Sequence, residues 1–281
     1  MSTVVSVVIP YYHGDRFVPR LLHMMEENAD LLIKNGENEL EVLFVNDSPE
    51  ETVIVKGDHS FQIKILINPK NQGIHATRVH GLKKAKGEYI LFLDQDDMIT
   101  GNCLESQLRH IGEADLVIGN GYDTEPGGKK HLIFRDRAHQ IAATHISCHY
   151  YYNNLIRSPG QVLIRKSSIP QYWADHILKN NGSDDALLWI LMLSQNCKTE
   201  INEESLYIHT FTGENASGDD AAMLRSQMEV AELLKGIASP LGMHAFRRRA
   251  KYYCQGKDNK KLGYLDVGLS RALYSKLFFR N

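Results

Sequence analysis

Two hydrophobic periodicities alternate along the first third of the chain, and this alternation constrains the fold more than any other feature. A short continuous apolar run, which is typical of a strand buried on both faces, occupies residues 4–9, and further strands are predicted at residues 41–45, 62–67 and 88–93. Apolar residues at helical spacing occupy residues 15–35 and 73–86. Strands that alternate with helices of this length predict βαβ units. We therefore expect an α/β fold with a mostly parallel sheet and helices on both faces.

Composition excludes several other classes of protein. The 281 residues are 43% hydrophobic and 23% charged, which is ordinary for a globular chain. A net charge of −2 implies no bulk attraction to nucleic acid. The four cysteines lie far apart in the sequence, which argues against a zinc cluster or a Cys-x-x-Cys pair. Because we find no signal-peptide pattern and no apolar run near the ~20 residues of a spanning helix, we expect a cytoplasmic protein.

The segment Asp94-Gln95-Asp96-Asp97 is the sharpest chemical signal in the sequence. It follows a buried strand, and ligands of open α/β sheets bind at the carboxyl ends of the strands. Three carboxylates in four residues repel one another, and a hard divalent cation would offset that repulsion. A solvated acidic turn would produce the same pattern, so the motif alone leaves both interpretations open.

An ordered set of motifs around this segment resembles family 2 glycosyltransferases of the GT-A fold, of the bacterial surface-polysaccharide type. The set comprises Val5-Ser-Val-Val-Ile-Pro10-Tyr11-Tyr12, Glu41-Val-Leu-Phe-Val45 with Asn46-Asp47-Ser48, an Asn71-Gln-Gly73 turn before a helix with Arg78, and Gly87-Glu-Tyr-Ile-Leu-Phe-Leu93 before the acidic segment. The family's second strand usually ends in Asp-Asp-Gly-Ser, so Asn46 departs from the pattern. The resemblance implies a GT-A-like, Rossmann-type sheet with a C-terminal helical tail.

The resemblance also implies a site for a nucleotide-sugar donor and a divalent metal, Mn²⁺ or Mg²⁺. Its implied donor-binding residues are Pro10 and Tyr11 beside the nucleobase, Asp47 at the base or ribose, Arg78 at the base or diphosphate, and Asp94 at ribose or sugar hydroxyls. Asp96 is the implied main metal ligand. His209 is a further candidate ligand, although Thr212 stands where the family's histidine is expected.

A second acidic pair, Asp184-Asp185, precedes an apolar helical run. It is similar to the family's Glu-Asp pair, and a carboxylate there can take the proton from an acceptor hydroxyl. We therefore assign Asp185, with Asp184, as catalytic residues. A helix N-cap at Ser183 with acids in the first turn explains the same pattern, and both interpretations can hold together.

The function expected from this resemblance is that of an inverting hexosyl- or N-acetylhexosaminyl-transferase. It would move a sugar from a nucleotide-diphosphate donor, expected to be a UDP-sugar, to a hydroxyl of a glycan or lipid-linked acceptor. Residues 1–120 would bind the donor, residues 121–217 of the same GT-A domain would bind the acceptor and supply the base, and residues 218–281 would form a basic helical segment. The alternatives are a sugar-nucleotide nucleotidyltransferase and a non-catalytic member that binds a sugar or a partner.

The C-terminal segment differs in charge from the rest of the chain. Residues 241–281 contain ten Lys or Arg and two Asp, and the final stretch mixes basic with aromatic residues. Such a segment could contact anionic lipid at the inner face of a membrane. An ordinary solvated helical tail explains the composition equally well.

Overall fold

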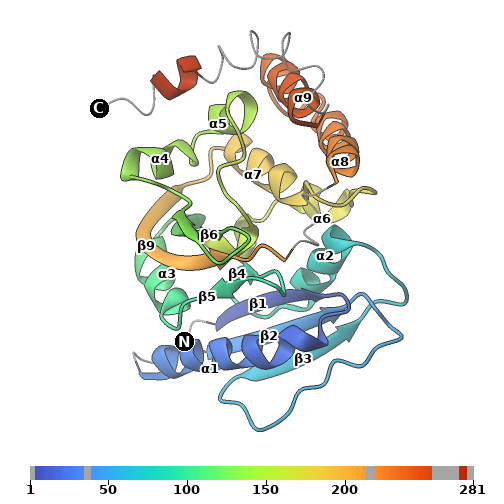
Figure 1. The fold of residues 1–281 in the computed structure, drawn as a ribbon, viewed down its shortest axis with the longest axis vertical. Coiled ribbons are helices and arrows are strands. Elements are labelled where there is room, and N and C mark those ends of the chain that lie inside the picture. Colours follow the sequence, from blue (N-terminus) through green and yellow to red (C-terminus); the bar gives the residue numbers. More distant parts are fainter. Residues whose placement is uncertain (1–3, 35–38, 213–218, 255–271, 277–281) are drawn as a thin grey trace. The chain divides into compact units, whose positions relative to one another are not determined.

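The computed structural model describes residues 4–34, 39–212, 219–254 and 272–276. The chain forms two compact units that interleave along the sequence. The first unit comprises residues 1–133, 157–169 and 198–212, and the second comprises residues 134–156, 170–197 and 213–281. The sheet belongs to the first unit, whereas the described part of the second unit consists of helices and their connections (Figure 1). The functional division predicted at residues 120 and 217 stays a prediction.

The sheet of the first unit has nine strands in the order β3-β2-β1-β4-β8-β6-β9-β5, with β7 paired to β6. Its strands are β1 (Val4–Tyr11), β2 (Glu39–Asn46), β3 (Gln62–Ile67), β4 (Tyr89–Phe92), β5 (Met98–Ile99), β6 (Leu116–Thr124), β7 (Lys130–Leu132), β8 (Val162–Arg165) and β9 (Thr199–His209). The strands β3, β2, β1 and β4 are parallel neighbours, and so are β6 and β9. The strand β8 lies antiparallel between β4 and β6. The predicted α/β fold with a mostly parallel sheet is confirmed, and the antiparallel β8 makes the sheet mixed.

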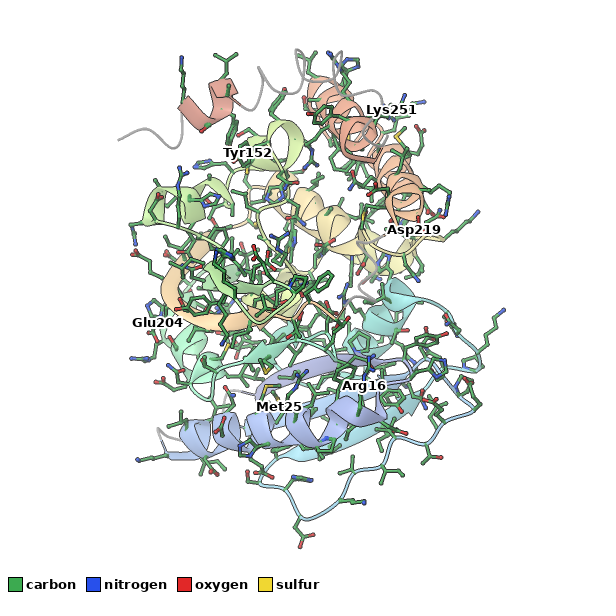
Figure 2. All side chains as sticks on the ribbon, viewed as in Figure 1. Arg16, Met25, Tyr152, Glu204, Asp219 and Lys251 are labelled. Atoms are coloured by element: carbon green, nitrogen blue, oxygen red, sulfur yellow. The ribbon has the colours of Figure 1, made fainter. Side chains whose placement is uncertain are left out.

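Helices cover the two faces of this sheet as the strand periodicity requires. On one face, Val7 of β1 belongs to a core cluster with Met25 of α1 (Val18–Lys34), which Figure 2 labels, and with residues of α3 (Cys103–Ile111). The next residue of β1, Val8, points to the opposite face and lies against α2 (Ile74–Lys84). A Cβ on Gly81 of α2 would lie 2.3 Å from a Val8 methyl, so glycine allows this close approach.

The second unit is built from short and medium helices around a buried one. Its helices are α4 (Arg137–Ala142), α5 (Ile146–Tyr151), α6 (Gln171–Asp175), α7 (Asp184–Ser194), α8 (Asp220–Leu233) and α9 (Pro240–Cys254), and residues 272–276 are also helical. Residues Ala186–Met192 of α7 are all buried, because this helix is apolar on every side. The buried Arg249 of α9 donates to the carbonyl of His149 and to Asn153, which ties α9 to the end of α5.

The predicted C-terminal helical segment is described for α8, α9 and residues 272–276. The remainder of the stretch 270–280, to which we attributed possible membrane contact, lies outside the described residues. Across the described ranges, no helix has both the length and the apolar character needed to cross a bilayer.

Candidate active site

Four parallel strands of the first unit end on one edge of the sheet, and the loops that follow them hold most of the predicted donor residues. The register pairs Tyr11 at the end of β1 with Asn46 at the end of β2, and Asn46 with Ile67 at the end of β3. The acidic segment follows β4, which runs parallel to β1. The edge therefore gathers loops from positions far apart in the sequence, as expected for a binding site of an α/β sheet.

The two tyrosines after Pro10 have different environments. The ring of Tyr11 is buried, and its hydroxyl lies 2.7 Å from Asp15 and 3.2 Å from Glu51. Burial and the nearby carboxylates raise the pKa of this hydroxyl. Tyr12 leaves 48% of its surface exposed. Tyr12, which the sequence analysis did not select, therefore has the more accessible ring, and the role of Pro10 and Tyr11 at the base stays a prediction.

The end of β2 shows why Asn46 is accommodated where the family usually has Asp. Its amide nitrogen donates to the Glu51 carbonyl at 2.8 Å, and its amide oxygen accepts from the Ser48 N–H at 2.7 Å. A carboxylate could accept the second bond but could not donate the first. The turn after β2 is therefore held by both the donor and the acceptor of the Asn46 side chain.

Asp47 is buried and organises the turn that opens α2. Its carboxylate accepts from the backbone N–H groups of Gln72 and Gly73 at 2.8 and 2.9 Å, and from the Asn68 amide at 2.8 Å. Gly73 has φ of 84°, a left-handed value that glycine adopts without strain. These contacts give Asp47 a role in shaping the site, and its predicted contact with the base or ribose stays a prediction.

Arg78 and Asp94 form a partly buried ion pair at the same edge. Arg78 on α2 is 3% exposed, and its guanidinium pairs with one carboxylate oxygen of Asp94. The other oxygen accepts from the Ser158 hydroxyl at 3.1 Å. The structure thus brings these two predicted residues together and adds Ser158, which enters from the segment before β8. Their predicted contacts with the donor remain untested.

The remaining two carboxylates of the acidic turn differ in environment. Asp97 is 1% exposed, receives hydrogen bonds from the Tyr207 hydroxyl and from the Thr210 N–H, and has its pKa raised to about 8 by burial and by the charges of Asp94 and Asp96. Burial and the charge of Asp94 also raise the pKa of Asp96. Asp97 therefore links the turn to the end of β9, and Asp96 bears charge that its surroundings do not fully compensate.

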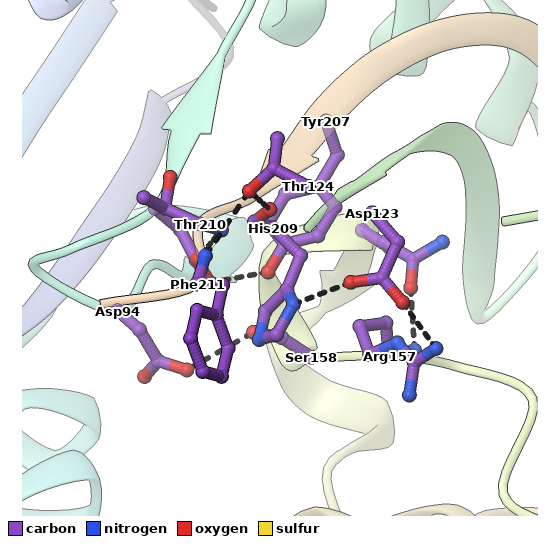
Figure 3. A network of polar contacts seen from close by, with 11 residues as sticks. Asp94, Asp123, Thr124, Arg157, Ser158, Tyr207, His209, Thr210 and Phe211 are labelled. Atoms are coloured by element: carbon purple, nitrogen blue, oxygen red, sulfur yellow. Dashed lines mark hydrogen bonds and ion pairs between the residues drawn. The ribbon is translucent and has the colours of Figure 1, made fainter. Parts of the chain in front are cut away.

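His209 at the end of β9 is held by a carboxylate on the neighbouring strand. Its Nδ1 lies 2.7 Å from Asp123 of β6, the residue with which it is paired in the sheet register, and Asp123 also pairs with Arg157 (Figure 3). Burial lowers the pKa of His209, but the bond to Asp123 and the charges of Asp97 and Asp123 outweigh it and raise the pKa. Histidines that ligate metals commonly donate their other ring N–H to a carboxylate in this way.

The chemistry of the turn fits a hard divalent cation. Asp96 supplies carboxylate oxygens whose charge the neighbouring Asp94 disfavours, and His209 is oriented by Asp123. Among the described residues, no three His, Cys, Asp or Glu side chains converge well enough to hold an ion by themselves. Mg²⁺ and Mn²⁺ sites of this kind are usually completed by water and by substrate phosphates.

Asp184 and Asp185 begin α7 in the second unit. Asp184 is 2% exposed, whereas Asp185 is partly exposed and accepts from the Asn154 amide at 2.9 Å. Ser183 occupies the N-cap position, but its hydroxyl makes no capping bond and instead lies 3.4 Å from the Met223 sulfur. Of the acidic pair, Asp185 is thus the carboxylate with access to solvent.

Several residues that contact or adjoin predicted residues within their own unit were missed in the sequence, namely Tyr12, Asp123, Arg157 and Tyr207 in the first unit and Asn154 in the second. No local pattern marks four of them. Asp123, Asn154 and Tyr207 contact His209, Asp185 and Asp97 across large sequence separations, and Arg157 contacts Asp123. The exception is Tyr12, which directly follows a predicted donor residue. Strand alternation could have indicated that neighbouring tyrosines at a strand end point to opposite sides.

A comparison with family models matches residues 6–173 to the family described as "Glycosyl transferase family 2". An uncharacterized glycosyltransferase of Haemophilus influenzae is 32% identical over 123 residues, which cover 42% of this chain and 46% of that protein. The putative glycosyltransferase EpsH of Bacillus subtilis is 30% identical over 126 residues, which cover 42% of this chain and 34% of that protein. The match therefore spans less than half the length of these curated relatives.

Two solved structures share the fold at low sequence identity. TarS 1–349 of S. aureus in complex with UDP-GlcNAc matches with a TM-score of 0.60 at 17% identity, over 95% of this chain and 79% of that one. Mannosyltransferase PcManGT from Pyrobaculum calidifontis in complex with GDP-Man and Mn²⁺ matches with a TM-score of 0.56 at 12% identity, over 98% of this chain and 76% of that one. The expected GT-A-like fold is confirmed. Because the family model matches more than half of its residues, this chain belongs to glycosyl transferase family 2.

Proposed function

We propose that this protein is an inverting glycosyltransferase that moves a sugar from a nucleotide-diphosphate donor, most simply a UDP-sugar, to a hydroxyl of a glycan or lipid-linked acceptor. The observation that supports this most strongly is the acidic turn after β4. Its Asp96 and Asp97 have raised pKa values because their charges are crowded and partly or fully buried at the carboxyl edge of the sheet. Such a turn is well suited to a cation shared with a diphosphate.

The donor side of the reaction is assigned to the first unit. Asp96 would hold the divalent ion, with His209 as a second ligand oriented by Asp123. When bound, a divalent ion neutralises the charge that grows on the leaving diphosphate. The exposed ring of Tyr12 would stack on the nucleobase, since aromatic side chains commonly bind bases in this way. TarS has been solved with UDP and with UDP-GlcNAc, and this supports a UDP-linked donor.

The acceptor side of the reaction is assigned to Asp185. The acceptor oxygen attacks the anomeric carbon while the bond from that carbon to the diphosphate oxygen breaks. The nucleoside diphosphate leaves with the bonding electrons, and the Asp185 carboxylate takes the proton of the acceptor hydroxyl. A single displacement of this kind inverts the anomeric configuration. The partial exposure of Asp185 and its bond from Asn154 support this assignment over Asp184.

We further propose that the basic C-terminal segment contacts anionic lipid at the inner face of a membrane, where a lipid-linked acceptor would be found. In α9, Leu241, His244, Arg248 and Lys251 are exposed at spacings of three and four residues, which places them along one helix face. Figure 2 labels Lys251 of this set. Binding to vesicles that contain phosphatidylserine, with phosphatidylcholine vesicles as the control, tests this contact.

Product analysis separates the proposed reaction from its two alternatives. The protein is incubated with Mn²⁺, radiolabelled UDP-GlcNAc or UDP-glucose and a panel of glycan and glycolipid acceptors. The proposal expects labelled acceptor and one free UDP for each sugar transferred. In a parallel incubation with UTP and a sugar 1-phosphate, release of pyrophosphate would identify a nucleotidyltransferase. Metal-dependent UDP binding without turnover across the acceptor panel would identify a non-catalytic member.

A further inference from the structure

We propose that Gln95 is a positioning residue that clamps the loop after β1 onto the acidic turn and so fixes Tyr12 at the donor site. The clamp consists of contacts between the side chain of Gln95 and the backbone of Tyr12. Its consequence for nucleotide binding rests on the proposed function. Gln95 is the uncharged residue of the acidic segment Asp94–Asp97, and the proposed metal and donor chemistry gives it no task.

The Gln95 side chain pairs with the backbone of Tyr12 as the backbone of a neighbouring strand would. The Gln95 amide oxygen accepts from the Tyr12 N–H at 3.0 Å, and the Gln95 amide nitrogen donates to the Tyr12 carbonyl at 2.8 Å. A primary amide places a donor and an acceptor side by side, as a peptide group of a neighbouring strand does. One side chain thereby satisfies both backbone groups of Tyr12, and this holds the backbone from which the Tyr12 ring projects.

The residue at position 14 is shaped to admit this amide. A Cβ on Gly14 would lie 2.1 Å from the Gln95 amide oxygen and 2.8 Å from its amide carbon. The φ of Gly14 is −108°, which any residue can adopt, so its backbone conformation does not require glycine. Glycine instead leaves the space that the Gln95 amide occupies, and a side chain here would have to displace that amide. The neighbouring His13 has φ of 48°, a left-handed value that needs surrounding contacts to hold it. The N–H of His13 donates to the Ser48 hydroxyl at 3.1 Å, and the Gln95 bonds fix the residue before it.

The acidic turn is braced from its other side as well. Arg20 of α1 donates to the Asp96 carbonyl at 2.8 Å. The turn is therefore fixed through a side-chain amide and a backbone carbonyl, and neither contact uses the carboxylates of Asp94 or Asp96. The acidic turn and the loop that contains Tyr12 would therefore move as one rigid body. A nucleobase on Tyr12 and a diphosphate at Asp96 would then bind at a fixed distance from each other. Preorganisation of this kind raises affinity without adding a contact to the ligand.

The first test compares Gln95→Ala with the parent chain and with Gln62→Ala, which alters an exposed glutamine of β3 as a matched control. Amide hydrogen exchange at Tyr12, read by NMR, should quicken at least about tenfold in Gln95→Ala, because its acceptor is removed. The dissociation constant of UDP in the presence of Mn²⁺, measured by calorimetry, should rise about tenfold, an effect of the size expected for a lost pair of hydrogen bonds. Both quantities should match the parent in Gln62→Ala.

A second variant disrupts the same contact from the other partner. Gly14→Ala adds a methyl where the Gln95 amide lies and leaves the acidic turn unchanged in sequence. It should reproduce the faster exchange at Tyr12 and the weaker UDP binding. In the double variant the methyl meets no amide, so the two effects should fail to add. This variant keeps the inference testable if Gln95→Ala does not fold.

The outcomes separate the clamp from the function. Unchanged exchange at Tyr12 in both single variants would overturn the clamp, and faster exchange with parental UDP affinity would overturn its role in positioning the donor. If the parent chain binds neither UDP nor GDP in the presence of Mn²⁺, the proposed function fails, while the exchange measurement still decides whether Gln95 holds the loop.

Discussion

At the carboxyl edge of the sheet, some acidic residues hold the loops in place, and another is available for the proposed metal ion. Asp47 and Asp97 are buried and take hydrogen bonds from backbone N–H groups, so both fix the course of a loop. Asp96 bears a carboxylate with a raised pKa at the same edge. The same residue type therefore has different tasks according to burial and hydrogen-bond partners.

The environment of Asp97 predicts how the metal-free protein responds to pH. Its pKa rises from 3.8 to about 8 on folding, so between these values the native chain binds a proton that the unfolded chain has lost. Unfolding must release this proton, so the free energy of unfolding falls as pH rises through the interval. Asp97→Asn should flatten that decline in urea unfolding between pH 4 and pH 8, whereas the exposed Asp30→Asn should retain it. An equal decline in both variants would contradict the assignment.

Asn154 gives a prediction about the proposed base. Its amide donates to Asp185, and a donor to the charged form favours ionisation. Asn154→Ala should lower kcat about tenfold, leave the KM for the donor unchanged and move the acidic limb of the kcat profile to higher pH. Steady-state kinetics across pH provides the measurement. A loss confined to the donor KM, with an unmoved pH profile, would count against a link between Asn154 and the base.

The site residues that could be predicted from sequence are those that lie in local patterns. The acidic turn, Asp47, Arg78 and Asp185 each stand beside a strand end or a helix start, where chemistry and spacing mark them. Asp123 could not be found in this way, because its partner His209 lies 86 residues away and meets it only through the pairing of β6 with β9. Contacts between distant segments depend on register, which a single sequence does not specify.

At the scale of secondary structure, the edge of the sheet opposite the site is tied together by one buried acid. Glu41 near the start of β2 is 2% exposed, accepts from the Ser6 hydroxyl of β1 at 2.5 Å and pairs with Lys64 of β3 at 2.6 Å. The N–H of Lys86, before β4, also donates to it. Although burial acts to raise the pKa of Glu41, these partners outweigh it and lower the pKa.

This arrangement predicts an acid-sensitive contribution to stability. A lowered pKa favours folding above the unfolded value of 4.5, and the contribution is lost as pH falls below it. Glu41→Gln should reduce the free energy of unfolding by about 2 kcal/mol at pH 7, and by less at pH 3.5. Urea unfolding measures both values, with the exposed Glu39→Gln as the matched control. A difference that stays constant with pH would show that the charge of Glu41 does not contribute.

The secondary structure was predictable in the first third of the chain, where strand and helix periodicities alternate, and less predictable for the strands that follow β4. The strands β1 to β4 and the helices α1 and α2 lie where the sequence predicts them. β1, β2 and β4 are buried as their apolar runs indicate, whereas β3 is the edge strand and leaves Ile65 and Ile67 exposed. The antiparallel insertion of β8 between β4 and β6 could not be predicted. The strand has only four residues, three of them apolar, and such a short run is compatible with several positions in a sheet.

At the scale of the whole molecule, the proposed chemistry is divided between the two units. The acidic turn belongs to the first unit and Asp185 to the second. Binding and transfer should therefore be separable by substitution. Asp185→Asn should leave the affinity for UDP with Mn²⁺ unchanged and lower the transfer rate at least about 100-fold, since general base catalysis contributes about 100- to 10,000-fold. Transfer at the parental rate by this variant would exclude Asp185 as the base.

The account depends above all on a cation held by the turn after β4 and shared with the diphosphate of the donor. Calorimetric titration of UDP into the parent chain and into Asp96→Ala, each with and without Mn²⁺, tests this claim most directly. We predict that the parent binds UDP far more tightly with Mn²⁺ than without it, and that Asp96→Ala loses the difference. Equal UDP affinity in the two proteins, or a parental affinity that Mn²⁺ does not change, would contradict the account.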